Sequence, residues 1–314
     1  MTGTRASRTS NIDILVSEVG PRDGLQSVEA TMPTAVKHRW ITALADAGLR
    51  EIEVASFVSA KRLPQMADAA EVVARALEIP NLNVLALVPN VTGARNAIAA
   101  GARALSMPIS ASRAHSESNV GMSPEQALRQ VAAIAELRTQ TTDFHFEVGV
   151  STAFGCTVEG PVSEDWVIEL AVTAAHNGAD SVGLSDTTGY ANPAQVRRLF
   201  TRLQAELGDR AGGAHLHNTR GQGLANVTAA LDVGVTTFDS SQAGLGGCPY
   251  APGASGNIVT EDLVYLLESM GLRTGVDLEA LIAARSVIAE GLPGENLYGH
   301  VPDAGLPKGF AYVE

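Results

Sequence analysis

Two histidines that lie two positions apart, His215 and His217, are the clearest chemical signal in this chain of 314 residues. They end a run, 213–217, that the sequence predicts as a strand. Because side chains two positions apart on a strand point to the same side, both imidazoles face the same environment. At the mouth of a barrel they could hold one metal ion. The alternative is two core histidines with separate hydrogen-bond partners.

A histidine pair needs further ligands to complete a metal site, and two oxygen donors are suitable. Asp23 follows the first predicted strand, and Asn257 ends the glycine-rich segment 244–257. Mixed nitrogen and oxygen ligation with open positions is typical of a Lewis-acid divalent ion such as Mg²⁺, Mn²⁺ or Zn²⁺. These ligand types by themselves do not distinguish among the three ions.

Further charged residues fall at or near the ends of predicted strands. Arg22 precedes Asp23, Glu53 lies in an otherwise apolar run, Asp186 follows the run 181–184, and Glu18 lies inside the first strand. The alternative for Arg22 is a solvated pair with Asp23. For Glu53 and Asp186 the alternative is structural pairing, either with Arg22 or with a ligand imidazole.

The segment 244–257 contains five glycines, two prolines and Cys248. Glycine is entropically costly in helices and strands, and proline interrupts both, so this segment is predicted to be a loop. It is either a functional loop that carries a reactive thiol or a flexible connection with an inert cysteine.

The elements that must position these residues alternate between strand and helix. Strands are predicted at 12–19, 51–54, 82–88, 102–108, 144–150, 181–184, 213–217 and 235–240. Helices are predicted at 33–48, 64–77, 91–101, 123–138, 163–178, 193–207, 221–234, 259–270 and 278–290. The strands are interpreted as apolar rather than alternating, which is typical of a parallel sheet covered by helices. The pattern predicts an α/β fold, a TIM (β/α)₈ barrel with an extra C-terminal helix and cap. A doubly wound open sheet is the alternative.

Composition limits the function classes. Residues 1–11 are polar and are predicted to be a disordered tail rather than a secretory signal, and 12–314 are predicted to form a single catalytic domain. The net charge is −12, and no Lys/Arg cluster indicates nucleic-acid binding. No apolar run is long enough to span a membrane. Two cysteines are too few for a disulfide framework, which favours a reducing compartment.

Several of these segments together resemble the 3-hydroxy-3-methylglutaryl-CoA lyase family of the metal-dependent lyase and Claisen-synthase superfamily, which is built on TIM barrels. The matching segments are 18–26, 53–57, 185–187, the two histidines, and 244–257. The resemblance implies cleavage of 3-hydroxy-3-methylglutaryl-CoA to acetyl-CoA and acetoacetate with Mg²⁺ or Mn²⁺. It also implies an acyl-CoA substrate, a homodimer and, for a bacterial member, a cytoplasmic location.

The resemblance also assigns roles to residues of this chain. The implied metal ligands are Asp23, His215, His217 and Asn257. The implied catalytic residues are Arg22, which stabilises the enolate, Cys248, which transfers a proton, and Asp186 and Glu53, which give polar support. The implied substrate contacts are Arg22, Gln26, Ser56 and Asn119.

The chain departs from the family pattern at the segment 112–119. The lyases usually have an acid at position 113 and basic residues before Asn119, whereas this chain has Arg113, Glu117 and Ser118. Asn218 and Arg220 also differ, since an Asp and an aromatic residue are common there. These departures leave the identity of the substrate's acyl group undetermined. The alternative substrate is another 3-hydroxyacyl-CoA, such as (R)-citramalyl-CoA. A condensing synthase and a non-catalytic binding relative are further alternatives.

Overall fold

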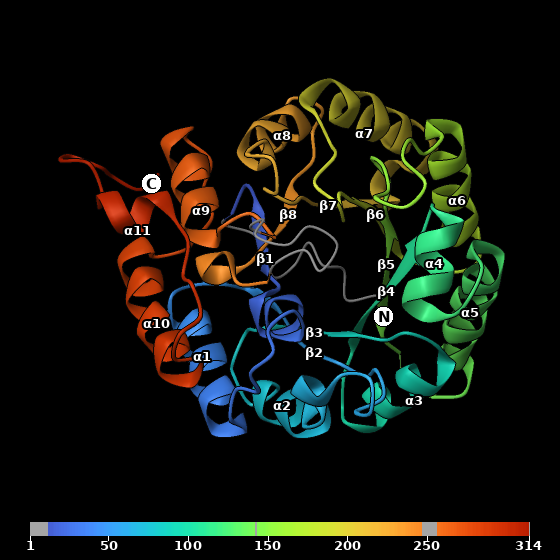
Figure 1. The fold of residues 1–314 in the computed structure, drawn as a ribbon, viewed down its shortest axis with the longest axis horizontal. Coiled ribbons are helices and arrows are strands. Elements are labelled where there is room, and N and C mark those ends of the chain that lie inside the picture. The colour runs from blue at the N-terminus through green and yellow to red at the C-terminus, as the bar shows by residue number, and fades with distance from the viewer. Residues whose placement is uncertain (1–11, 142, 247–255, 314) are drawn as a thin grey trace.

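The computed structural model describes residues 12–141, 143–246 and 256–313. Eight parallel strands form a closed barrel in chain order, with β1 paired to β8, inside a ring of helices (Figure 1). The predicted TIM barrel is confirmed, and the open sheet is excluded. The predicted disordered tail at 1–11 and the predicted catalytic Cys248 lie outside the described residues.

The strands and helices alternate along the chain. The strands are β1 (Leu15–Glu18), β2 (Glu51–Ser56), β3 (Asn83–Leu87), β4 (Ala104–Ser110), β5 (His145–Ser151), β6 (Ser181–Ser185), β7 (Ala211–His215) and β8 (Thr237–Ser240). The helices are α1 (Thr34–Asp46), α2 (Ala69–Ala76), α3 (Val91–Ala99), α4 (Arg113–Val120), α5 (Pro124–Glu136), α6 (Glu164–His176), α7 (Pro193–Leu207), α8 (Gly223–Leu231), α9 (Thr260–Ser269), α10 (Leu278–Gly291) and α11 (His300–Ala304). A π-helical turn, η2 (Gly20–Gly24), follows β1, and short 3₁₀ turns lie at η3 (Pro64–Met66), η4 (Leu137–Thr139), η5 (Gly208–Arg210) and η6 (Gln242–Gly244).

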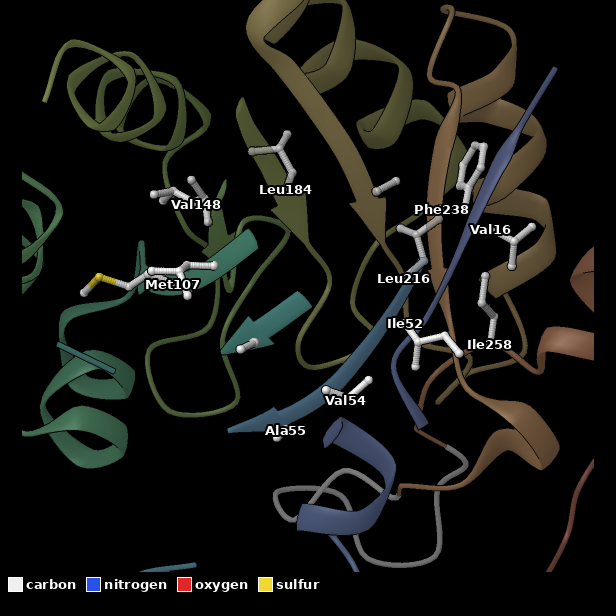
Figure 2. Close-up of a cluster of buried hydrophobic side chains, with 14 of the residues drawn as sticks. Val16, Ile52, Val54, Ala55, Met107, Val148, Leu184, Leu216, Phe238 and Ile258 are labelled. Carbon is white, nitrogen blue, oxygen red and sulfur yellow. The ribbon is translucent and has the colours of Figure 1, made fainter. Parts of the chain in front are cut away.

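The main apolar core lies between the strands and the surrounding helices. Strand residues such as Val16, Ile52, Leu184 and Phe238 are almost completely buried and belong to one hydrophobic cluster (Figure 2). Burial of these side chains removes apolar surface from water and stabilises the closed barrel. Among the described residues, no helix combines the length and apolar character that a bilayer crossing requires.

The strand faces that point toward the barrel axis are less apolar than the sequence predicted. In β5, Glu147 and Gly149 are partly exposed and alternate with the buried Val148 and Val150. The prediction of continuously apolar strands is therefore wrong for part of the sheet. The prediction fails because only the outer face of the sheet packs against helices. The cavity that the inner face borders is lined by many small and polar residues, such as Ser106, Glu147 and Gly183, together with Leu85 and Leu87 of β3.

The C-terminal helices cover one side of the barrel and hold the end of β8. Helix α10 packs against α1, and α11 packs against α9. Gln242 in η6 accepts a hydrogen bond from Nε1 of Trp40 at 2.6 Å and donates from Nε2 to the carbonyl oxygen of Leu281 at 2.5 Å. These bonds fix the chain at the point where it leaves β8 and enters the glycine-rich segment.

Candidate active site

A cavity of about 790 Å³ opens at the carboxyl ends of the strands. Its wall includes His215, which ends β7, and Ser185 and Ser151, which end β6 and β5. The cavity continues down the barrel as far as Ser181 and Thr237, the first residues of β6 and β8. The chemistry of (β/α)₈ barrels is located at this carboxyl-end face, so the cavity is the candidate active site.

Arg22 and Asp23 are presented to the cavity by the π-helical turn η2. The backbone nitrogens of both residues donate to the carbonyl oxygen of Val19, at 3.1 Å and 2.6 Å. A Cβ atom at Gly20 would lie 2.6 Å from Oε1 of Glu18, so a larger residue there would displace that carboxylate. π-helical turns occur often at functional sites, and this one aims two adjacent charged residues into the cavity.

The two predicted metal-binding histidines converge. Nε2 of His215 lies 3.1 Å from Nε2 of His217. One ligand atom from each of Asp23, His215 and His217 falls within 4.8 Å of the others. The strand was predicted to run to His217, but β7 ends at His215. The following residues instead pair with 256–258.

This second pairing brings Asn257 to the site from the far end of the glycine-rich segment. Asn257 forms an antiparallel bridge with His217, and the backbone nitrogen of Asn218 donates to the carbonyl oxygen of Gly256 at 2.8 Å. Nδ2 of Asn257 donates to Oδ2 of Asp23 at 2.6 Å. At the described start of the segment, a Cβ atom at Gly246 would lie 3.3 Å from the carbonyl oxygen of Asp23, so both ends border the site.

The protonation states at this cluster suit a divalent metal. Burial, with the neighbouring His215, lowers the pKa of His217 to about 3, which leaves a neutral imidazole with a lone pair. Burial would raise the pKa of Asp23, but the charge of Arg22, the neighbouring His215 and the hydrogen bond from Asn257 lower that pKa. Oδ1 of Asn257 is buried and has no hydrogen-bond partner among the described residues. Two imidazoles, a carboxylate and an unsatisfied amide oxygen fit a cation with mixed nitrogen and oxygen ligands.

Arg22 is held between two carboxylates. Its Nε donates to Glu53 and its Nη1 donates to Asp23, and Ser106 on β4 donates to the other oxygen of Glu53. Burial opposes the charge of Arg22, but Asp23 and Glu53 outweigh it and raise its pKa. Gln26 donates from Nε2 to Oδ1 of Asp23 at 2.7 Å. The guanidinium is therefore charged and fixed beside the candidate metal ligands.

Asp239 on β8 is a site residue that sequence reasoning missed. Its Oδ2 lies 3.0 Å from Nδ1 of His215, so Nε2 of that ring points toward the cluster. A carboxylate behind a ligand histidine fixes its tautomer and orientation. Burial would lower the pKa of His215, but the hydrogen bond and charge of Asp239 raise it. The sequence did contain a signal for this site residue. Asp239 is an acid within a buried strand, two positions after Thr237 and therefore on the same side of that strand.

Other predicted residues lie behind the cavity wall. Ser56 is fully buried, with no partner for Oγ in the described part of the chain, and does not line the cavity. Oδ1 of Asp186 accepts from the backbone nitrogens of Tyr190 and Ala191 at 2.8 Å and 3.1 Å, and burial raises its pKa to about 6. Asp186 therefore orders the connection from β6 to α7 and is not part of the cavity lining.

Glu18 also has a structural position. Its two oxygens accept from the backbone nitrogens of Gly20 and Gln242, at 2.8 Å and 2.9 Å, and from the hydroxyl of Thr260 at 2.6 Å. Burial raises its pKa to about 8. Glu18 thereby joins the end of β1 to η6 and α9 beneath the site.

Residues 113–119 of this segment lie in helix α4, an element that the sequence did not predict, and Ser112 is its N-cap. Arg113 is half exposed and pairs with Glu125 at 2.5 Å and with Glu117 at 3.8 Å, so these residues face solvent. The cavity side of α4 carries His115 and Asn119. The departures from the family pattern at Arg113 and Glu117 therefore lie outside the cavity lining.

Comparison with known proteins agrees with this geometry. A family model described as HMGL-like matches residues 13–288. The mouse protein named mitochondrial hydroxymethylglutaryl-CoA lyase is 41% identical over 297 residues, which cover 93% of this chain and 91% of that protein. The rat protein named cytoplasmic 3-hydroxy-3-methylglutaryl-CoA lyase is 39% identical over 277 residues, which cover 88% and 80%.

A solved structure shares both the sequence and the fold. It is an HMG-CoA lyase from Acinetobacter baumannii in complex with coenzyme A and 3-methylmalate, and it is 39% identical to this chain. The two superpose with a TM-score of 0.88 over 96% of this chain and 98% of that chain. The family match and the extent of these similarities establish that the chain belongs to the HMGL-like family.

Proposed function

We propose that this protein is a divalent-metal-dependent lyase that cleaves 3-hydroxy-3-methylglutaryl-CoA to acetyl-CoA and acetoacetate. The observation that carries the proposal is the convergence of Asp23, His215 and His217 beside Arg22 on one cavity at the strand carboxyl ends. Relatives that are 41% and 39% identical over most of their length and bear this activity in their names support it.

The reaction breaks the bond between the carbinol carbon and the α-carbon of the thioester. The hydroxyl loses its proton and becomes the ketone of acetoacetate, and the electron pair of the broken bond passes to the α-carbon as a thioester enolate. That carbon then gains a proton to become the methyl group of acetyl-CoA. Catalysis needs a way to remove the hydroxyl proton, a partner for the enolate oxygen and a proton donor.

The ligand set would be His215, His217, Asp23 and Asn257, and Mg²⁺ or Mn²⁺ is the expected ion. When bound, such an ion acts as a Lewis acid that lowers the pKa of the substrate hydroxyl. Asp239 holds the ring of His215 in the orientation that this binding requires.

Arg22 would stabilise the developing enolate charge. Its guanidinium lines the cavity and is fixed by Glu53 and Asp23, so it needs no rearrangement as the charge develops. Gln26 and Asn119 line the same cavity and are proposed to contact the acyl-CoA. Cys248, outside the described residues, is proposed from the family resemblance as the group that transfers the proton.

A panel of acyl-CoA thioesters tests this assignment. The full-length protein is incubated with Mg²⁺ or Mn²⁺ and with 3-hydroxy-3-methylglutaryl-CoA or (R)-citramalyl-CoA, and acetyl-CoA release is measured for each. We expect faster release from the first thioester, with acetoacetate as the second product. Release from (R)-citramalyl-CoA alone, with pyruvate as the second product, would replace the proposed substrate with the alternative.

The oligomeric state, the cellular location and the extent of the catalytic domain are also proposals. A homodimer follows from the family resemblance, and size-exclusion chromatography with light scattering would measure its mass. A cytoplasmic location is supported by the two cysteines, which favour a reducing compartment. The single catalytic domain at 12–314 stays a prediction, and limited proteolysis would define its boundaries.

A further inference from the structure

The cavity continues down the barrel, below the candidate metal ligands. Ser181 lines it four positions before Ser185, the last residue of β6, and Gly213 lines it two positions before His215, the last residue of β7. Ser185 and His215 pair in register at the carboxyl ends of these strands. Four residues of strand correspond to about 13 Å. The candidate metal ligands therefore lie at the outer end of an interior space that extends along the whole of β6.

Gly149 on β5 provides room in this interior. It lines the cavity and is partly exposed, whereas the residues on either side of it are buried. A Cβ atom there would meet, among the described residues, only Oγ of Ser185 at 3.4 Å, which is an ordinary contact. At Gly183, by contrast, a Cβ atom would lie 2.5 Å from the carbonyl oxygen of Gly213. The fold thus requires glycine at 183 but not at 149, and a glycine within a strand often marks the close approach of a ligand.

The substrate proposed above has two groups that could enter the interior. Its carbinol carbon, C3, carries the hydroxyl that would reach the metal and the thioester arm that leads to the mouth and to coenzyme A. The other two groups are a carboxylate arm and a methyl branch. Three acids line the interior: Glu53, Glu147 and Asp239. Because like charges repel, the carboxylate arm is disfavoured there and the uncharged branch is the group that enters.

The interior is suited to an uncharged group. Each of the three acids already lies against a nitrogen-bearing side chain: Arg22, His145 and His215, respectively. Leu85 and Leu87 on β3 add apolar surface to the lining. An alkyl branch in this space would therefore gain apolar contacts without separating an ion pair.

We propose that the barrel interior beside Gly149 binds the branch at C3, so that the enzyme cleaves 3-hydroxyglutaryl-CoA thioesters whose uncharged branch is longer than methyl; this inference rests on the proposed lyase function. The bond between C3 and the α-carbon of the thioester breaks as before. The hydroxyl loses its proton, and the α-carbon takes the electron pair and then a proton. A propyl branch would give acetyl-CoA and 3-oxohexanoate. The methyl compound is a substrate that leaves this space unused.

Two uncleavable thioesters test the pocket independently of turnover. 3-Methylglutaryl-CoA and 3-propylglutaryl-CoA lack the 3-hydroxyl group and differ only in the branch. Isothermal titration calorimetry with the Mn²⁺-loaded protein would give both affinities. We expect the propyl compound to bind about 10-fold more tightly, since each of its two additional methylenes contributes roughly fourfold when buried. Gly149→Val, which fills the space, should abolish this preference, and Gly149→Ala should remove part of it.

Turnover provides the second readout. 3-Hydroxy-3-methylglutaryl-CoA and 3-hydroxy-3-propylglutaryl-CoA also differ only in the branch. The wild-type protein should have the higher kcat/KM for the propyl compound, and Gly149→Val should reverse that order. Ala132→Val, on the exposed face of α5, enlarges a side chain far from the pocket lining and is the control. It should leave both ratios at the wild-type value.

The outcomes separate this inference from the proposed function. Gly149→Ala, whose Cβ makes only an ordinary contact, decides the question if Gly149→Val does not fold. Weaker binding of the propyl compound by the wild-type protein, or an unchanged affinity ratio in the folded Gly149 variants, would overturn the pocket. Cleavage of neither hydroxylated thioester by the wild-type protein would contradict the lyase function instead, and the titrations with the uncleavable pair would still decide the role of Gly149.

Discussion

Asn257 and Asp23 are 234 positions apart in the chain and are joined by a hydrogen bond of 2.6 Å. Asp23 lies on the π-helical turn after β1, and Asn257 is the last residue of the glycine-rich segment after β8. Because β1 and β8 are neighbours in the closed barrel, these two connections meet over the same end of the sheet. Closure of the barrel therefore assembles the candidate metal site from both ends of the sequence.

Removal of the Asp239 carboxylate should weaken metal binding, although this residue is not a proposed ligand. Asp239→Ala frees Nδ1 of His215, so the ring loses its fixed orientation. We expect Mn²⁺ affinity to fall by about 10- to 100-fold, measured by calorimetry. Asp239→Asn should have a smaller effect because its amide oxygen still accepts the hydrogen bond. Asp209→Ala, an exposed acid, is the control, and an unchanged affinity in Asp239→Ala would contradict the positioning role.

Substitution of Arg22 should slow the chemical step. Arg22→Gln removes the charge proposed to stabilise the enolate, and we expect kcat to fall by about 10²- to 10³-fold. Steady-state kinetics with 3-hydroxy-3-methylglutaryl-CoA would measure it, and circular dichroism would verify the fold because Glu53 loses its partner. Arg202→Gln, which removes a surface ion pair on α7, should keep wild-type turnover. A change in KM alone would indicate that Arg22 only binds substrate.

Buried Glu18 makes the stability of the protein depend on pH. Its pKa is raised from 4.5 to about 8, so the folded protein retains a proton that the unfolded chain releases. The free energy of unfolding should therefore fall as pH rises from about 4.5 to about 8, by at most about 5 kcal/mol from this residue. Glu18→Gln, which cannot ionise, should lack this part of the dependence. Urea unfolding at several pH values would show parallel curves for the two proteins if Glu18 makes no contribution.

Cys248 is expected to act in proton transfer on the basis of the family resemblance. Cys248→Ser keeps the size of the side chain but raises the pKa of the donor, and kcat should fall by about 10²- to 10⁴-fold. Mn²⁺ affinity should stay at the wild-type value, since Cys248 is not a proposed ligand. Cys156→Ala serves as the control for the other cysteine, which is buried after β5. Wild-type turnover in Cys248→Ser would remove this thiol from the mechanism.

The sequence predicted the fold and the convergence of Asp23, His215 and His217 because both depend on strong local patterns. Alternating strands and helices indicated the barrel, and the position of a polar residue after a strand placed Asp23 and His217 at one face. Asn257 was a candidate oxygen ligand from its residue type, and the resemblance implied the same role. The bridge that brings this residue to His217 depends on a long-range pairing that local patterns do not indicate.

The sequence analysis missed site residues whose position depends on which face of a strand borders the cavity. Glu147 and Asp239 are acids in largely buried strands; Glu147 lies between Phe146 and Val148, and Asp239 follows Phe238, so both were visible in the sequence. The interpretation as apolar strands concealed both acids. Helix α4 was missed because the segment 113–120 has a weak helical pattern and is held by the Ser112 N-cap and the Gly121 C-cap. His115 consequently escaped notice although it lines the cavity.

The most direct test of the account measures products before and after metal addition. Full-length protein treated with a chelator and dialysed is mixed with 3-hydroxy-3-methylglutaryl-CoA, and acetyl-CoA and acetoacetate are both quantified. We expect no release until Mg²⁺ or Mn²⁺ is added, then equal molar amounts of the two products, and little recovery in His217→Ala. Metal-independent release, or full activity in His217→Ala, would contradict cleavage at the cluster formed by Asp23, His215 and His217.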